Sequence, residues 1–179
     1  LKGEVKSFDV YKIPLDLLLY NKRNGRIISW MNKLESEGVV VGELSKDEYN
    51  EKVETMIVDS NRTALEKTKK NIKALGQIHP GVVLNNGTVI DGNRRFTCLR
   101  QLKREDGGDL FFEAVILDPE EGLTDADIKR LELRIQHGEE RPVDYNAIDN
   151  LVDVYNDIRI NRYFTTKEYA ANIGKKESD

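Results

Sequence analysis

The sequence predicts a small α/β domain followed by a helical C-terminal half. Between Ala64 and Leu102 the pattern runs helix, strand, tight turn, strand and helix, and an apolar strand over Phe111 to Leu117 comes next. From Thr124 onward the pattern becomes helical. The chain has 179 residues, a length that suits one compact domain with a helical extension.

The N-terminal part of the chain predicts a strand, a turn and two helices. The strand leads to a turn at Asn21 to Arg26, and apolar residues around Trp30 then indicate a short helix. A second helix, of mixed charge, is predicted over Glu43 to Val58. Ser45 is its expected N-cap, because Glu48 three residues later completes a capping box. We interpret this second helix as an insertion into the N-terminal domain.

A further helix opens the predicted core. The helical spacing of Leu65, Ile72 and Leu75 predicts that it begins near Ala64. Gly76 follows at the C′ position, where glycine commonly ends a helix because it adopts a left-handed backbone without strain. The chain then turns into two short strands.

A hairpin follows this helix. Its first strand is Val82 to Leu84, an apolar run typical of a buried strand, and its second is Val89 to Ile90. Asn85, Asn86 and Gly87 lie between the strands and favour a tight turn, since asparagine and glycine tolerate the backbone that such turns require.

The most informative segment is the corner between the second strand and the next helix, which we call the arginine corner. It consists of Gly92, Asn93, Arg94 and Arg95. At such a corner the free backbone N–H groups, the positive helix end and two guanidinium groups can converge on phosphate. The sequence therefore predicts an anion site. The alternative is that both arginines are solvated or paired with local carboxylates, as most surface arginines are.

The rest of the chain is predicted to be one strand and three helices. Asp106 to Asp109, with two glycines, is the turn before the Phe111 to Leu117 strand. The helices are predicted over Asp125 to Gln136, Val143 to Ile158 and Thr166 to Ile173.

We therefore expect two regions. The first is an α/β domain over residues 1–119, with its helical insertion at about 43–60. The second is a helical region over residues 120–179.

Composition and charge limit the classes of function. The sequence shows no signal peptide and no apolar run long enough to span a membrane, so we expect a soluble, cytoplasmic protein. Its single cysteine, Cys98, cannot form an internal disulfide and is expected to be buried. The formal charge of −4 disfavours a domain whose main task is to coat nucleic acid.

Several weak motifs occur in one order along the chain: Ile13-Pro14-Leu15, Asn21 to Arg26, Ile72, Gly76-Gln77-Ile78, Pro80, Gly92, Arg94-Arg95, Ile135-Gln136 and Pro142-Val143. In this order they resemble the N-terminal domain of ParB proteins, a fold shared with sulfiredoxin and often labelled ParB-like nuclease. Thr165 to Gly174 is similar to the first helix and turn of a helix-turn-helix, whose remainder we expect beyond Asp179. The resemblance implies a small mixed-sheet core.

The resemblance also implies site residues. In that family the glycine-x-arginine-arginine motif holds the triphosphate of a nucleotide, CTP in partition proteins and ATP in sulfiredoxin, with Mg²⁺ nearby. Carried over by position, the nucleotide-binding residues are Gly92, Asn93, Arg94, Arg95, Gln77, His79 and Arg134. Asp91 and Glu132 are the candidate Mg²⁺ ligands, because this ion prefers carboxylate oxygens. Thr166 and Lys167 are the candidate DNA contacts.

Departures from the family pattern concern catalysis. Partition proteins carry a glutamate where Asn93 stands and a glutamate-asparagine pair where Leu133 and Arg134 stand. Because those groups support metal binding and hydrolysis, we expect slow or absent nucleotide turnover. Sulfiredoxin requires a cysteine at the position of Asn93, whereas Cys98 lies five residues later, so we set that chemistry aside.

We interpret the chain as a nucleotide-binding, DNA-associated protein of the partition or transcription-regulator type. We expect a homodimer that binds CTP or ATP and contacts DNA mainly through residues beyond Asp179. Two alternatives stay open. One is a ParB-like nuclease or a component of DNA modification or phage defence, and the other is a non-catalytic interaction module in which the arginine corner only staples the fold.

Overall fold

The computed structural model describes residues 7–21, 28–36, 38, 40–118, 124–138 and 147–176. The described residues form two compact units. The first comprises those up to Leu19 together with Asn61–Asp118, and the second comprises those of Tyr20–Ser60 and Pro119–Asp179. The segment Tyr20–Ser60, which we expected as part of the N-terminal domain, thus groups with the C-terminal helices.

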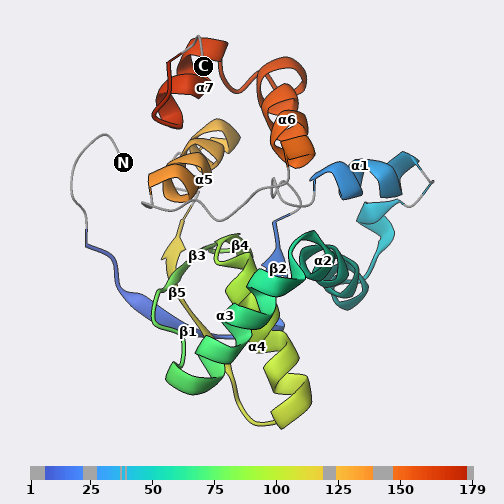
Figure 1. Cartoon of the computed structure of the whole chain (residues 1–179), viewed down its shortest axis with the longest axis vertical. Coiled ribbons are helices and arrows are strands. Elements are labelled where there is room, and N and C mark those ends of the chain that lie inside the picture. Colours follow the sequence, from blue (N-terminus) through green and yellow to red (C-terminus); the bar gives the residue numbers. More distant parts are fainter. Residues whose placement is uncertain are drawn as a thin grey trace. The chain divides into compact units, whose positions relative to one another are not determined.

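The first unit holds a mixed sheet and two helices (Figure 1). Its elements are β1 (Val10–Pro14), a 3-10 turn (Leu15–Leu17), β2 (Leu19–Tyr20, at the boundary between the units), α3 (Arg62–Leu75), β3 (Gly81–Leu84), β4 (Thr88–Asp91), α4 (Asn93–Asp106) and β5 (Phe111–Leu117). Within the described residues five strands form one sheet in the order β1-β5-β3-β4-β2. β5 pairs antiparallel with β1 and parallel with β3, and the β3–β4 hairpin is antiparallel. The predicted α/β class is confirmed.

The core of this unit lies between the sheet and the helix pair α3–α4. Strand β5 shows why, because its buried residues Phe112 and Ala114 alternate with the more exposed Phe111 and Glu113. The buried ring of Phe112 packs on Phe96 of α4, with ring centroids 5.9 Å apart. Burial of these large side chains supplies the main stabilising contribution.

The second unit is helical. Its elements are α1 (Ile28–Ser36), a 3-10 turn (Val41–Glu43), α2 (Lys46–Ser60), α5 (Asp125–Gly138), α6 (Ala147–Tyr155), a π-helical segment (Asn156–Ile160) and α7 (Thr166–Asn172). Helix α1 contacts α6, and α5 contacts α7. The α5–α7 contact contains a core of Leu133, Phe164 and Tyr169. Among the described residues, no helix combines the length and apolarity that crossing a membrane requires.

Two helix starts of this unit are fixed by capping boxes. At α2 the Glu48 carboxylate accepts from the Ser45 backbone N–H at 2.9 Å, and the Glu48 N–H donates to Ser45 Oγ at 3.3 Å. The predicted cap is therefore confirmed. Thr165 and Glu168 make the same reciprocal pair at α7.

Most predicted elements of the first unit agree with the structure, but the 3-10 turn and the short strand β2 after β1 were not predicted. The hairpin, the helix after the arginine corner and strand β5 are confirmed. Gly76 ends α3 with a φ of 75°. Leu75, however, is 70% exposed, because the last residue of the helix extends past the buried surface that covers Leu65 and Ile72.

In the second unit the predicted helix Val143 to Ile158 is only partly observed. The described part, α6, gives way at Asn156 to the π-helical segment. Residues 22–26, Pro142-Val143 and residues 144–146 lie outside the described residues, as does the side chain of Gln136, so those expectations stay predictions.

Gly81 packs too closely for a larger side chain. A Cβ at this position would lie 2.3 Å from Phe112 Cζ and 2.7 Å from the Asp91 carbonyl oxygen. We expect Gly81→Ala to lower the free energy of unfolding by about 1–3 kcal/mol, since a packed strand cannot give way. Gly42→Ala is the matched control, because nothing lies within 4 Å of a Cβ there. Urea unfolding of both variants measures the difference, and equal effects would contradict the close packing.

Candidate functional site

The arginine corner is built by a left-handed glycine between β4 and α4. Gly92 has φ 91° and ψ 18°, and its carbonyl accepts the first helical hydrogen bond, from the Phe96 N–H at 2.9 Å. A Cβ on Gly92 would lie 2.8 Å from Phe112 Cζ and 3.0 Å from an Arg95 nitrogen. Glycine is therefore required for backbone conformation and for space. The first N–H groups of α4 have no intrahelical acceptor.

Arg95 ties the corner to the loop before β3. Its Nη2 donates to Asp91 Oδ2 at 2.8 Å and to the Pro80 carbonyl at 3.4 Å. Both side chains are mostly buried, so this ion pair is less screened than an exposed one. Asp91 thus holds the guanidinium group in place. This ion pair is expected under the alternative interpretation, in which the arginine corner only stabilises the fold.

The corner also contains buried polar atoms that the fold does not satisfy. Asn93 Oδ1, Arg94 Nη2 and Arg95 Nε are each inaccessible to solvent and have no hydrogen-bond partner. Such atoms are rare in native structures because an unmade buried hydrogen bond costs about 1–3 kcal/mol. Two of the three are guanidinium donors at the positive end of α4, an arrangement suited to an anion.

The two loop residues predicted to approach the nucleotide behave differently. The Gln77 amide donates to the Glu113 carbonyl at 2.6 Å and accepts from the Glu113 N–H at 3.0 Å. Its Nε2 also donates to the His79 carbonyl at 3.0 Å. Gln77 therefore acts as an extra strand neighbour of β5, with its amide engaged. The His79 side chain is exposed.

The remaining predicted site residues belong to the second unit. Arg134 on α5 is exposed, as are Thr166 and Lys167 on the first turn of α7. Glu132 is buried on α5 and pairs with Lys129 at 3.5 Å. The structure therefore brings together Asp91 to Arg95 in the first unit and leaves these four residues in the other.

Both carboxylates predicted as magnesium ligands have a cationic partner in the structure. Asp91 is held by Arg95, and Glu132 by Lys129. Among the described residues no three His, Cys, Asp or Glu side chains gather closely enough to hold a metal ion.

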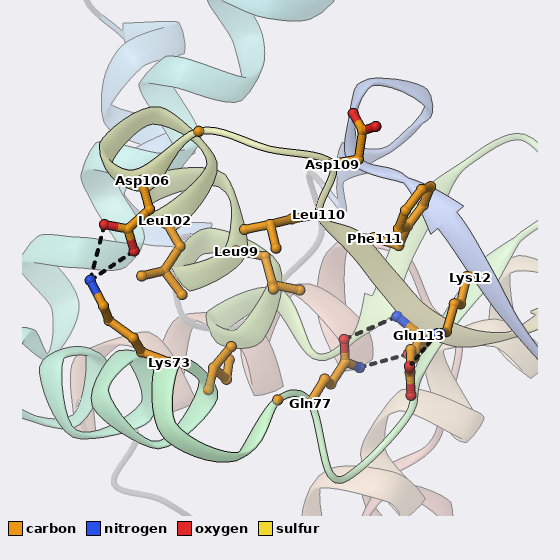
Figure 2. Close-up of a pocket in the computed structure, with 13 residues that line it drawn as sticks. Lys12, Lys73, Gln77, Leu99, Leu102, Asp106, Asp109, Leu110, Phe111 and Glu113 are labelled. Atoms are coloured by element: carbon orange, nitrogen blue, oxygen red, sulfur yellow. Dashed lines mark hydrogen bonds and ion pairs between the residues drawn. The ribbon is translucent and has the colours of Figure 1, made fainter.

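A cavity that the sequence did not predict lies at the opposite end of α4 (Figure 2). It has a volume of about 330 Å³ and is lined by Lys12, Ile72, Lys73, Gly76, Gln77, Leu99, Leu102, Asp106, Gly107, Asp109, Leu110, Phe111 and Glu113. Its two lysines are already paired: Lys73 with Asp106 at 2.7 Å and Lys12 with Glu113 at 3.8 Å. The lining comes from segments far apart in the sequence, so no local motif could have revealed it.

Comparisons with known proteins give structural likeness at low identity. No family model and no curated protein matches the chain. A C-terminally truncated chromosome-partitioning protein ParB from Caulobacter crescentus, solved with CTP-gamma-S, is 15% identical with a TM-score of 0.42; the match covers 95% of this chain and 73% of that one. A Pnob8-like ParB-N domain is 11% identical with a TM-score of 0.48, covering 96% and 66%. Both are ParB proteins, the family that the sequence resembles.

Cys98, which follows the corner by one helical turn, is a structural thiol. Its Sγ lies 3.5 Å from the Leu65 carbonyl, and burial raises the pKa of the thiol to about 12, which the Arg94 charge only partly offsets. The predicted burial of Cys98 is confirmed.

We expect this thiol to resist reagents in the folded protein. Because the thiolate is the reactive form, modification by a disulfide reagent at neutral pH should be at least about 100-fold slower than for the urea-unfolded chain. The chain has one cysteine, so the absorbance change reports on Cys98 alone. A Cys98→Ala variant gives the blank. Fast modification without denaturant would contradict the burial.

Proposed function

We propose that the arginine corner binds the phosphate group of a nucleotide. The observation that carries this proposal is the pair of buried, unsatisfied guanidinium donors, Arg94 Nη2 and Arg95 Nε, at the N-terminus of α4. A phosphate has several acceptor oxygens, which suit guanidinium donors and the free N–H groups of a helix start. Gly92 lets the backbone approach the ligand closely.

The neighbouring groups favour a nucleotide over a bare anion. Asp91 fixes one end of Arg95 while leaving its Nε as the unsatisfied donor. Asn93 Oδ1, in the same corner, is a buried acceptor without a hydrogen-bond partner, so a ligand that also carries hydrogen-bond donors suits the corner. A nucleotide offers hydroxyl and amino groups next to its phosphates, whereas a fully ionised phosphate offers only acceptors. The sequence resemblance makes CTP or ATP the first candidates.

The wider role that we propose is that of a DNA-associated protein of the ParB type, partition or regulatory, acting as a homodimer. Its support is the sequence resemblance and helix α7, whose capped start leaves Thr166 and Lys167 exposed. The net charge of −4 makes the chain a poor general DNA binder. The Asp91–Arg95 ion pair is the observation that favours the second candidate, a non-catalytic module.

Calorimetry with CTP, ATP and GTP tests the nucleotide site. We expect at least one to bind, and Arg94→Ala to weaken binding about 10- to 100-fold, because charge-assisted hydrogen bonds contribute about 1.5–3 kcal/mol each. Arg104→Ala is the matched control, an exposed arginine at the other end of α4. If none of the three nucleotides binds, or if both variants bind like the parent, the arginine corner has only a structural role.

We also expect slow or absent hydrolysis of the bound nucleotide. Asn93 is not a carboxylate, and Asp91 is committed to Arg95, so no described group at the corner is placed to activate water through a metal ion. Phosphate release with Mg²⁺, with and without duplex DNA, measures this. Brisk release that Asp91→Ala abolishes would show that Asp91 supports turnover and would overturn the expectation.

A further inference from the structure

The second unit buries a lysine among three carboxylates, which we call the Lys129 cluster. Lys129 Nζ lies 2.9 Å from Asp153 Oδ1, 3.5 Å from Glu132 Oε2 and 3.7 Å from Asp157 Oδ2. The lysine side chain is 3% exposed, and those of Glu132 and Asp157 are 2% and 3% exposed. Charged side chains are almost never this buried unless they are paired.

Within the described part of the Lys129 cluster, Asp157 is the carboxylate with the weakest compensation. The ammonium group lies closer to Asp153 and Glu132 than to the almost fully buried Asp157. Asp153 takes the short contacts, at 2.9 and 3.0 Å. Asp157 Oδ2 is buried and accepts no hydrogen bond. A buried carboxylate with so little compensation is costly when ionised, and a proton removes that cost.

The weak compensation of Asp157 determines how the cluster titrates. Burial raises the pKa of Asp157 to about 7, and the charges of Asp153 and Glu132 act in the same direction against Lys129. Burial alone would lower the pKa of Lys129, but the carboxylates raise it above its ordinary value, so the lysine stays charged. Asp157 is therefore the group that gains or loses a proton.

The position of Asp157 connects this proton to α7. Asp157 lies in the π-helical segment, and its carbonyl accepts from the Tyr163 N–H at 2.9 Å. Arg162, between them, has a φ of 53°, a left-handed conformation that non-glycine residues adopt only when the surroundings hold them there. Phe164 and Tyr169 then pack into the α5–α7 core.

We propose that the Lys129 cluster is a proton-binding site that sets how firmly α7 and the preceding π-helical segment are held against α5. Its charged and titratable members come from each packed element: Lys129 and Glu132 from α5, Asp153 from α6, Asp157 from the π-helical segment, and Tyr169 from α7. Binding of a solvent proton to Asp157 leaves one lysine with two carboxylates. Loss of that proton adds a buried negative charge that acts on Tyr169 of α7.

The sign of the pH effect follows from linkage. A carboxyl group whose pKa is raised by folding binds its proton more tightly in the folded state, so stability falls as pH rises from the ordinary aspartate range to the raised value. Between pH 5 and 7 we expect the ratio of folded to unfolded chain to fall by at least about tenfold, and to level off above that range.

Denaturant unfolding of the full chain across this range tests the proposal. Asp157→Asn resembles the protonated form, so its stability should match the parent at low pH, exceed it at pH 8 and lack the slope. Glu51→Gln, an exposed acid of α2 in the same unit, should keep the slope of the parent. Parallel curves for the parent and Asp157→Asn, or an equal loss at every pH, would overturn the proposal.

A carboxyl ¹³C titration of the parent needs no variant and keeps the test decisive if Asp157→Asn does not fold. We expect the Asp157 carbon to titrate near neutral pH and the ring signals of Phe164 and Tyr169 to shift with the same midpoint. A midpoint in the ordinary aspartate range would refute the proton site. Ring signals that do not follow the carboxyl group would refute its coupling to α7.

Discussion

The close approach of two glycine backbones to one phenylalanine ring is the constraint on which the first unit depends. Phe112 lies on β5, between β1 and β3 in the sheet, and both Gly81 at the start of β3 and Gly92 just after β4 abut its ring. The ring also packs on Phe96 of α4. One side chain of β5 therefore fixes where the hairpin begins, where it ends and where the next helix starts.

The chemistry of the arginine corner is a consequence of that packing. Because Gly92 is held against Phe112, the N-terminus of α4 and its two arginines are placed beside the end of β4. Asp91 then orients Arg95, while Arg94 Nη2 and Arg95 Nε remain buried without acceptors. The fold thus buries polar atoms without hydrogen-bond partners, at a cost to its own stability.

Both units contain buried polar side-chain atoms without hydrogen-bond partners, but the chemistry of these atoms differs. In the first, buried donors of the arginine corner have no hydrogen-bond partner, and we propose a phosphate as that partner. In the second, the buried Asp157 carboxylate lies 3.7 Å from the Lys129 ammonium group, and we propose a proton as its partner. In both units the reasoning is the same, because a buried polar atom without a partner indicates what the molecule binds.

Local signals in the sequence determined much of the fold. Several signals act within a few residues of the chain: the Ser45–Glu48 cap, the turn from Asn85 to Gly87, and Gly92. The order of helices, strands and corner could therefore be predicted from the chain alone. The α/β class followed from that order. The position of the arginine corner between β4 and α4 could be predicted too, because its residues are adjacent in the chain.

Only the tertiary structure decided which groups partner one another across the fold. Gln77, expected to approach a nucleotide, instead pairs with the backbone of β5, and Glu132, expected to bind metal, faces a buried lysine. The grouping of Tyr20–Ser60 with the C-terminal helices likewise had no local signal. Spacing along a chain specifies neighbours within a helix or a turn, whereas the partner of a buried charge comes from another element, and packing alone determines which element that is.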